Sequence, residues 1–291
     1  MKKITFFLVL IIAISCQAQL LWKVSGPGLE KPSYLFGTYH LMPSTFVDSV
    51  PGLNKAIESA DEVWVEIENE KMKSPEVLTQ MSALMTAPAD STIDRLISPD
   101  GYKIVDTVVR RYLGMFGVTL DQVKMMRPAA LSLQLEQLMA MKKLPNSDFS
   151  HLLDGEVERR VKALGKPSHS LESVDFQIQL FFGSPLQKQA ADLLEMCKNI
   201  DEVERNFDDI HQAYVTQDFD KLTAAITNPV TMDEEDLATV CFERNEKWLP
   251  TLIDAAKKGS IIVAVGAAHL VLERGLITLL RLQGYTVEPV K

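Results

Sequence analysis

The stretch "IIVAVGAAHLV", residues 261–271, decides the expected fold. Its first five residues are apolar and mostly β-branched, which is typical of a strand buried on both faces of a parallel sheet. A glycine ends this run, and His269 follows three residues later. The stretch "SYLFGTYHLMP", residues 33–43, has the same layout and places His40 three residues after a glycine. The chain therefore has two predicted strands that each end in Gly-x-x-His.

Two further predicted strands end in glutamate. The segment "VWVEIE", residues 63–68, places Glu66 inside an apolar run and Glu68 two residues later. The segment "HSLES", residues 169–173, ends a short predicted strand with Glu172. Each half of the chain thus pairs a glutamate strand with a Gly-x-x-His strand. This internal similarity predicts an α/β fold with a central mixed β-sheet built from two related halves.

The other predicted elements surround these strands. Residues 20–24 and 33–36 flank a Gly- and Pro-rich turn and predict a hairpin. A helix over residues 51–60 then leads to a strand over 62–67, and this order favours parallel pairing of the strands that flank the helix. Apolar residues at helical spacing predict a large helical insertion at about residues 74–150, with helices packed around the sheet.

The N-terminal residues 1–18 have the pattern of a signal peptide. Two lysines precede an apolar run that is too short to span a membrane, and small residues lead to a cleavage site after Ala18. Lipid attachment at Cys16 is the alternative. In either case we expect residues 19–291 to form a single exported domain, periplasmic or extracellular, without a transmembrane helix.

Composition argues against a nucleic-acid partner, and it does not decide whether the two cysteines outside the signal peptide are bonded. The 291 residues are 46% hydrophobic and 24% charged, as in ordinary globular proteins. The net charge of -9 argues against a nucleic-acid partner, because phosphate binding needs clustered Lys and Arg. Cys197 and Cys241 lack metal-binding spacing, so they are either bonded to each other or buried as free thiols.

The two histidines and Glu66 have the chemistry of a metal site. Ligands of parallel sheets bind beyond the carboxyl ends of the strands, where His40 and His269 are expected. A buried carboxylate such as Glu66 is costly unless it is paired or bound to a metal. Imidazole and carboxylate together suit Mn, Co or Zn, which can activate water for hydrolysis. The alternative is that Glu66 and Glu68 form the solvated face of an edge strand.

Three further side chains are candidate catalytic groups. Glu172 or Glu68 would serve as an additional ligand or as general base. Arg244, in "CFERNEKW", would stabilise an oxyanion or a substrate carboxylate. The alternative for Arg244 is a surface salt bridge on an acidic helix.

Taken together, the motifs resemble the TraB/GumN family. They are "LFGTYHLMP", "VWVEIE", "MRPAALSL", "GKPSHSLES", "ERNEKW" and "VAVGAAHLVLERGLITLLRLQGYTV". The family includes the TIKI metalloproteases of animals and is related more widely to erythromycin-esterase-like and haem-binding ChaN-like folds. The resemblance implies a divalent-metal site, and in the animal branch proteolysis of a secreted signalling protein. Matched residue by residue, its functional positions are His40, Glu66, Glu172, Arg244, Asn245 and His269.

Two positions depart from the family pattern. Leu272 stands where the family often has a glycine after the second histidine, and Glu68 stands where many members have aspartate. The first change bears on the shape of the loop after His269.

We therefore expect an exported metal-dependent hydrolase, in its leading form a peptidase with a peptide or protein substrate. His40, Glu66 and His269 would hold the divalent ion, and Glu172, Glu68 and Arg244 would act in catalysis. The alternatives are a ChaN-like protein that binds haem or metal without hydrolysis, and a member that only binds a partner.

Overall fold

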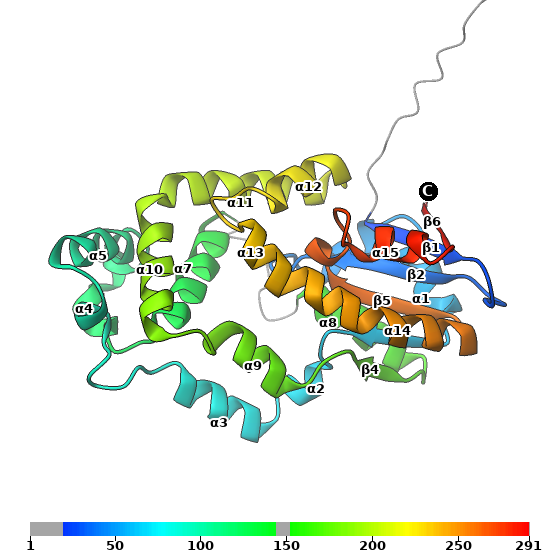
Figure 1. The fold of residues 1–291 in the computed structure, drawn as a ribbon, viewed down its shortest axis with the longest axis horizontal. Helices are drawn as coiled ribbons and strands as arrows, with labels where there is room; N and C mark the ends of the chain where they lie inside the picture. Colours follow the sequence, from blue (N-terminus) through cyan, green and yellow to red (C-terminus); the bar gives the residue numbers. More distant parts are fainter. Residues whose placement is uncertain (1–19, 144–151, 291) are drawn as a thin grey trace, which may run out of the picture.

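The computed structural model describes residues 20–143 and 152–290. Within this part, six strands form one mixed sheet in the order β4-β3-β5-β2-β1-β6, and helices surround it (Figure 1). The predicted α/β fold class is confirmed. The strands are β1 (Leu21–Ser25), β2 (Ser33–Thr38), β3 (Glu62–Val65), β4 (Ser168–Ser170), β5 (Ile261–Gly266) and β6 (Thr286–Pro289).

The strand pairing confirms one predicted contact and corrects another. β1 and β2 form the predicted antiparallel hairpin, with Leu21 opposite Phe36. β2 and β3 do not pair with each other as predicted, because β5 lies between them and runs parallel to both. A continuous apolar run such as that of β5 is buried on both faces and needs a neighbour on each side. β5 therefore lies between β2 and β3, which the order of elements along the chain had predicted to be neighbours.

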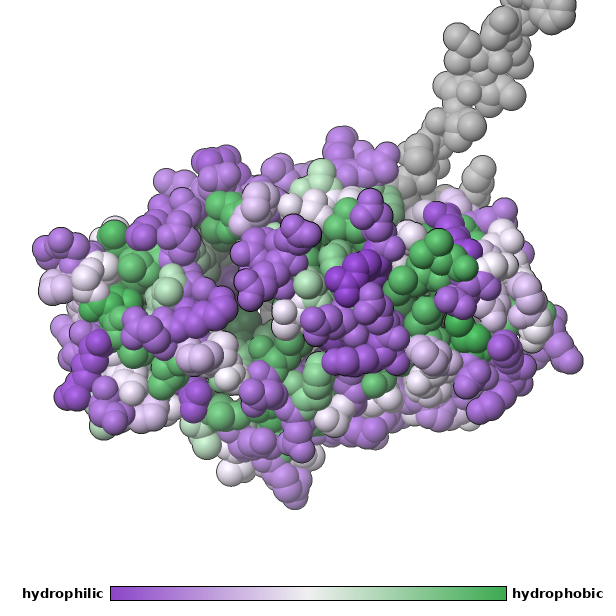
Figure 2. All heavy atoms as spheres, viewed as in Figure 1, coloured by the Kyte–Doolittle hydropathy of each residue, from purple (hydrophilic) through white to green (hydrophobic). Residues whose placement is uncertain are grey.

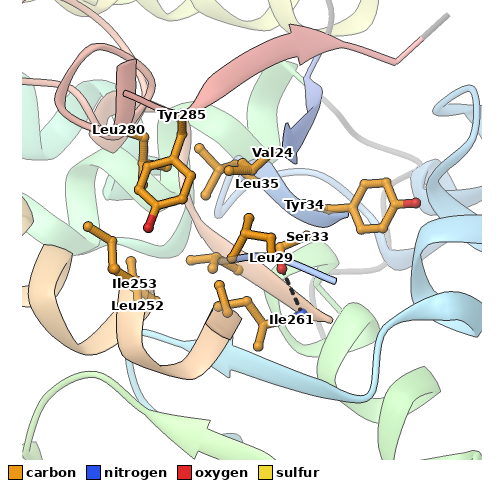
Figure 3. Close-up of a pocket in the computed structure, with 12 residues that line it drawn as sticks. Val24, Leu29, Ser33, Tyr34, Leu35, Leu252, Ile253, Ile261, Leu280 and Tyr285 are labelled. Carbon is orange, nitrogen blue, oxygen red and sulfur yellow. Dashed lines mark hydrogen bonds between the residues drawn. The ribbon is translucent and has the colours of Figure 1, made fainter. Parts of the chain in front are cut away.

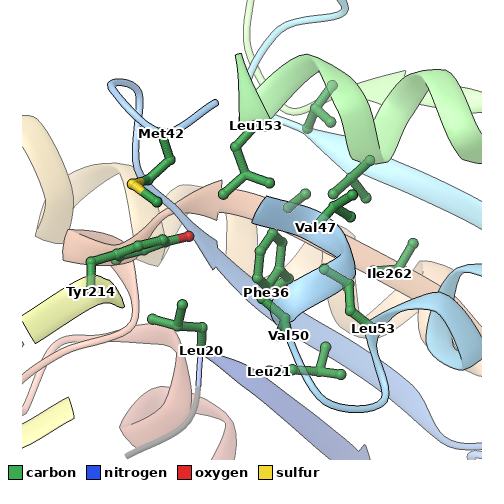
Figure 4. Close-up of a cluster of buried hydrophobic side chains, with 14 of the residues drawn as sticks. Leu20, Leu21, Phe36, Met42, Val47, Val50, Leu53, Leu153, Tyr214 and Ile262 are labelled. Carbon is green, nitrogen blue, oxygen red and sulfur yellow. The ribbon is translucent and has the colours of Figure 1, made fainter. Parts of the chain in front are cut away.

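Helices cover both faces of the sheet. On one face, α1 (Leu53–Ser59) and α8 (Leu153–Ala163) pack against Phe36 and Ile262 (Figure 4). On the other, α14 (Glu243–Lys258) and α15 (Leu276–Leu282) pack against the adjacent residues of the same strands, Leu35 and Val263. Successive residues of a strand point to opposite faces, so two adjacent apolar residues serve both cores.

A small apolar pocket lies between the second face and its helices. Leu35, Leu252, Leu280 and Tyr285 are among the residues that line it (Figure 3). At its edge the Ile261 amide donates to Ser33 Oγ at 3.1 Å, which ties β5 to the start of β2 (Figure 3). This pocket is at the amino ends of β2 and β5, the end of the sheet opposite His40 and His269.

Most of the remaining helices form a second helical part, on the left of Figure 1, whereas the helices within residues 213–237 contribute to the core of the sheet. The core of this second part includes Val109, Leu131, Leu135 and Leu193. The remaining helices come from two stretches of chain, one within the predicted insertion and one after β4. They are α3 (Pro75–Leu84), α4 (Ile93–Leu96), α5 (Pro99–Leu113), α6 (Leu120–Val123), α7 (Pro128–Lys143), α9 (Val174–Phe182), α10 (Leu186–Lys198), α11 (Ile200–Val215), α12 (Phe219–Ile226) and α13 (Glu234–Leu237).

The described residues also bear on the expectations about the two cysteines and about a transmembrane helix. Cys197 and Cys241 are both buried and free, so they are not bonded to each other. No helix in residues 20–143 and 152–290 is long and apolar enough to cross a membrane. The predicted signal peptide and Cys16 lie outside the described residues. Hydrophilic side chains cover most of the face in Figure 2, and hydrophobic ones gather in smaller patches.

Leu272, the position where the resemblance leads us to expect glycine, has an unusual backbone. Its φ is 67°, in the left-handed region that favours glycine. A branched side chain in this region brings Cβ close to the following carbonyl oxygen, which is costly. The loop thus keeps a glycine-like conformation although it carries a leucine.

We predict that Leu272→Gly stabilises the protein by about 0.5–1 kcal/mol. Relief of about 1–2 kcal/mol of backbone strain is offset by about 0.5–1 kcal/mol for the greater freedom of glycine in the unfolded chain. Urea denaturation measures the change. Leu272→Ala is the control, since it shortens the same side chain and keeps the strain. If the glycine variant is no more stable than the alanine variant, the loop is not strained.

Candidate active site

The carboxyl ends of four strands meet at one edge of the sheet. β2, β3, β4 and β5 are parallel, and the chain just beyond them carries the expected functional side chains. Gly266 lies at the centre of this edge. A Cβ atom placed on it would lie 3.5 Å from Glu66 Oε1, 3.7 Å from His269 Cδ2 and 3.8 Å from His40 Nε2. Atoms of all three predicted metal ligands therefore lie around Gly266, but residues 20–143 and 152–290 contain no group of His, Cys, Asp and Glu side chains already spaced to hold a metal ion.

His269 is buried and held in one orientation. Its side chain is 4% exposed, and Nδ1 lies 2.7 Å from Asn245 Oδ1. The Asn245 amide group donates to the carbonyls of His269 and Arg274, which leaves Oδ1 as the acceptor. Nδ1 of His269 therefore carries the proton, and Nε2 has the free lone pair. Burial lowers the pKa of His269 to about 4, so the ring is neutral at pH 7.

His40 has the opposite environment. Its side chain is 70% exposed, and Nδ1 lies 3.0 Å from Asp154 Oδ2 in the first turn of α8. Thr38 Oγ1 donates to the other oxygen of Asp154 and fixes the carboxylate. The Asp154 charge raises the pKa of His40 to about 9. As with His269, a polar partner holds Nδ1, and Nε2 faces the point beside Gly266.

Glu66 is ionised although it is enclosed. Its Oε1 accepts the Gly266 amide at 3.0 Å and lies 3.7 Å from His269 Nε2. Its Oε2 accepts from Arg244 Nη2 at 2.6 Å and from Gln177 Nε2 at 3.3 Å. Burial on its own would raise the pKa of Glu66, but the basic side chains around it lower the pKa to about 2. The carboxylate is therefore negative at all physiological pH values.

Arg244 is the cation at the centre of the cluster. Its side chain is only 3% exposed, which excludes the alternative of a surface salt bridge. Nε and Nη2 bind Glu172 in bidentate fashion at 2.7 and 2.8 Å. Nη1 donates to the Val240 carbonyl at 2.7 Å and to His269 Nε2 at 3.1 Å. The guanidinium therefore connects the predicted metal ligands to Glu172.

Glu172 and Glu68, the two predicted catalytic carboxylates, each have partners within the protein. The Glu172 carboxylate accepts the two Arg244 bonds and one from Trp248 Nε1 at 3.1 Å. Glu68 lies apart from the cluster, since β3 ends at Val65 and the chain turns into α2 (Asn69–Met72). Its carboxylate accepts from Ser170 Oγ at 2.9 Å and pairs with Lys71.

Sequence reasoning missed Asp154 and Gln177. Asp154 is 114 residues from His40 and resembles any acidic residue in the first turn of a helix. Gln177 is on α9 and is 111 residues from Glu66. Each reaches the site only through tertiary folding, and the local sequence holds no signal for either.

Nearly the whole chain, including the residues of the site, matches a known protein family. The model of the TraB/PrgY/gumN family matches residues 20–289. The chain belongs to this family. The match covers every strand of the sheet and all the residues of the cluster, so the resemblance inferred from the motifs is confirmed. No curated protein and no solved structure matches the chain.

We predict that Asp154→Asn lowers the pKa of His40 from about 9 toward its ordinary value of 6.5. The negative charge of Asp154 stabilises the imidazolium form, and asparagine cannot replace that charge. NMR titration of the His40 ring measures the shift. Asp48→Asn is the control, because Asp48 pairs with Arg160 instead. An unchanged His40 pKa in Asp154→Asn would show that the two side chains do not form an ion pair in solution.

Proposed function

We propose that this TraB/PrgY/gumN protein is an exported metal-dependent hydrolase that cleaves peptide bonds. The observation that carries the proposal is the orientation of the two histidines. Each Nδ1 is held by a polar partner, and each Nε2 faces Glu66 beside Gly266. Export rests on the sequence of residues 1–18 alone.

The chemistry of these donors fits a divalent ion. Two imidazole nitrogens and one carboxylate are a common ligand set of catalytic zinc sites, which keep a further position open. Metal-binding histidines almost always donate their other ring nitrogen to a carboxylate, carbonyl or water. Asp154 and Asn245 provide such partners here. His40, Glu66 and His269 would thus hold Mn, Co or Zn. A bound ion of this kind polarises a carbonyl and lowers the pKa of water.

The protein's own groups prepare the site for hydrolysis. Asp154 keeps His40 Nε2 directed at the point beside Gly266, and Asn245 does the same for His269. Arg244 places a fixed positive charge next to Glu66, where it would also stabilise negative charge that develops on a carbonyl oxygen. The stacking of Arg244 over Trp248, 4.8 Å from the ring centre, limits the access of water to this charge.

One observation favours a metal-free variant of the same reaction. His269 Nε2 already accepts a hydrogen bond from Arg244 Nη1. The pair of His40 and Asp154 resembles the base and the orienting carboxylate of hydrolases that use no metal. In this second candidate His40 acts as general base after it loses its proton, which its pKa of about 9 favours at alkaline pH, and the charge of Arg244 stabilises the oxyanion.

We predict metal-dependent cleavage of a peptide library. The purified protein should contain Mn, Co or Zn by elemental analysis, lose activity with a chelator and regain it with the ion. His269→Gln and Glu66→Gln should each lower kcat/KM by at least about a hundredfold with an unchanged circular dichroism spectrum. His169→Gln is the matched control, since His169 pairs with Glu62 at the other end of β3.

Three other results would redirect the proposal. Full activity without metal, lost in Asp154→Asn, would support the metal-free hydrolase. Bound metal without cleavage of any peptide would contradict the peptidase. A Soret band on haem addition that is absent in His40→Ala would support a haem-binding protein.

A further inference from the structure

The bond between Arg244 and His269 conflicts with metal binding at the same atom. Arg244 Nη1 donates to His269 Nε2 at 3.1 Å. A neutral imidazole has one free lone pair, and it lies in the ring plane on the nitrogen without a proton. Nδ1 offers no second binding atom, because it donates to Asn245 Oδ1. His269 can therefore accept from Arg244 or bind an ion, but not both at once.

Charge adds to this conflict. The guanidinium lies 2.6 Å from Glu66 Oε2 and also neutralises Glu172, in a region with little exposure to water. A divalent cation that binds Glu66 and His269 would approach this positive charge closely, and low exposure strengthens the repulsion. Arg244 thus already supplies the cation that these buried carboxylates require.

The contacts of Arg244 also allow it to release His269 without losing its place. The bidentate pair with Glu172 involves Nε and Nη2 and does not depend on His269. Nη1 has a second acceptor, the Val240 carbonyl, at 2.7 Å. Val240 belongs to a π-helical segment, Ala238–Phe242, that directly precedes α14, and such segments are frequent at functional sites. A small movement of Nη1 would therefore free Nε2 of His269 while the guanidinium stays bound.

We propose that Arg244 competes with the divalent ion for His269 and thereby sets the metal affinity of the site. The metal-free protein is a stable folded state in which Arg244 compensates Glu66 and Glu172. Ion binding displaces Nη1 from His269, and Glu172 and Val240 retain the arginine. This inference rests on the proposed metal-dependent function, and it adds that the ion is held weakly enough to exchange.

The test is a calorimetric titration of wild-type and Arg244→Gln protein with Mn²⁺ after removal of bound metal. Arg244→Gln removes the competing charge and leaves Glu66 and Glu172 without their cation. We expect the Kd for Mn²⁺ to fall at least about tenfold, since a buried unpaired carboxylate binds a new cation strongly. The Tm of the metal-free variant should fall, and Mn²⁺ should raise it by more than it raises the wild-type Tm.

Gln177→Ala is the matched control. Gln177 also donates to Glu66 Oε2, at 3.3 Å, but it carries no charge. Its Kd for Mn²⁺ should stay within about threefold of wild type, which is small beside the effect of a charge removed from a buried site.

The possible failures are distinguishable. If folded Arg244→Gln binds Mn²⁺ no more tightly than wild type, the competition is disproved and the metal-dependent function still stands. If neither protein binds Mn²⁺, both the competition and the metal site are disproved. If Arg244→Gln does not fold, ¹⁵N NMR of wild type decides the matter. The arginine Nε–H signal assigned to Arg244 should shift on addition of Zn²⁺, and a signal unchanged at saturating Zn²⁺ would overturn the competition.

Discussion

The buried ion pair between Arg244 and Glu172 is the constraint on which the rest of the site depends. A carboxylate in this enclosed position is stable only with a cation and hydrogen bonds beside it. Arg244 provides both for Glu172 and Glu66, and it does so from α14, on a different segment from either glutamate. The pair thus joins the helix to the ends of β3 and β4. The same guanidinium also contacts Glu66 and His269, so these side chains share the junction.

The two Gly-x-x-His segments are alike in sequence and different in chemistry. His269 is buried and its pKa is low, whereas His40 is exposed and its pKa is raised by Asp154. The difference comes from burial, which lowers the pKa of His269, and from the Asp154 carboxylate beside Nδ1, which raises the pKa of His40. Under the proposed function, the neutral histidine would bind the ion and the histidine that can carry a proton would take part in proton transfer.

Much of the fold was predictable because its signals are local. The Gly- and Pro-rich turn indicated the hairpin of β1 and β2, and the continuous apolar run of β5 indicated a buried parallel strand. The position of β5 between β2 and β3 was not predictable, because it depends on pairing between segments about 200 residues apart, as in the 200-residue separation of Gly266 and Glu66. The separation of Glu68 from Glu66 has a different, local cause. Strand alternation holds only while the strand continues, and β3 ends at Val65.

The order of the strands explains why neither half of the chain can form this site alone. The first half contributes β2 and β3, and the second contributes β4 and β5, but the sheet order β4-β3-β5-β2 interleaves them. Pairing of Val65 with Ala264 places Glu66 next to Gly266 and so opposite His269. Glu172 reaches Arg244 because β4 pairs with β3, its counterpart in the other half. Loss of either half would remove one histidine and one glutamate, and it would leave the remaining glutamate at an open sheet edge.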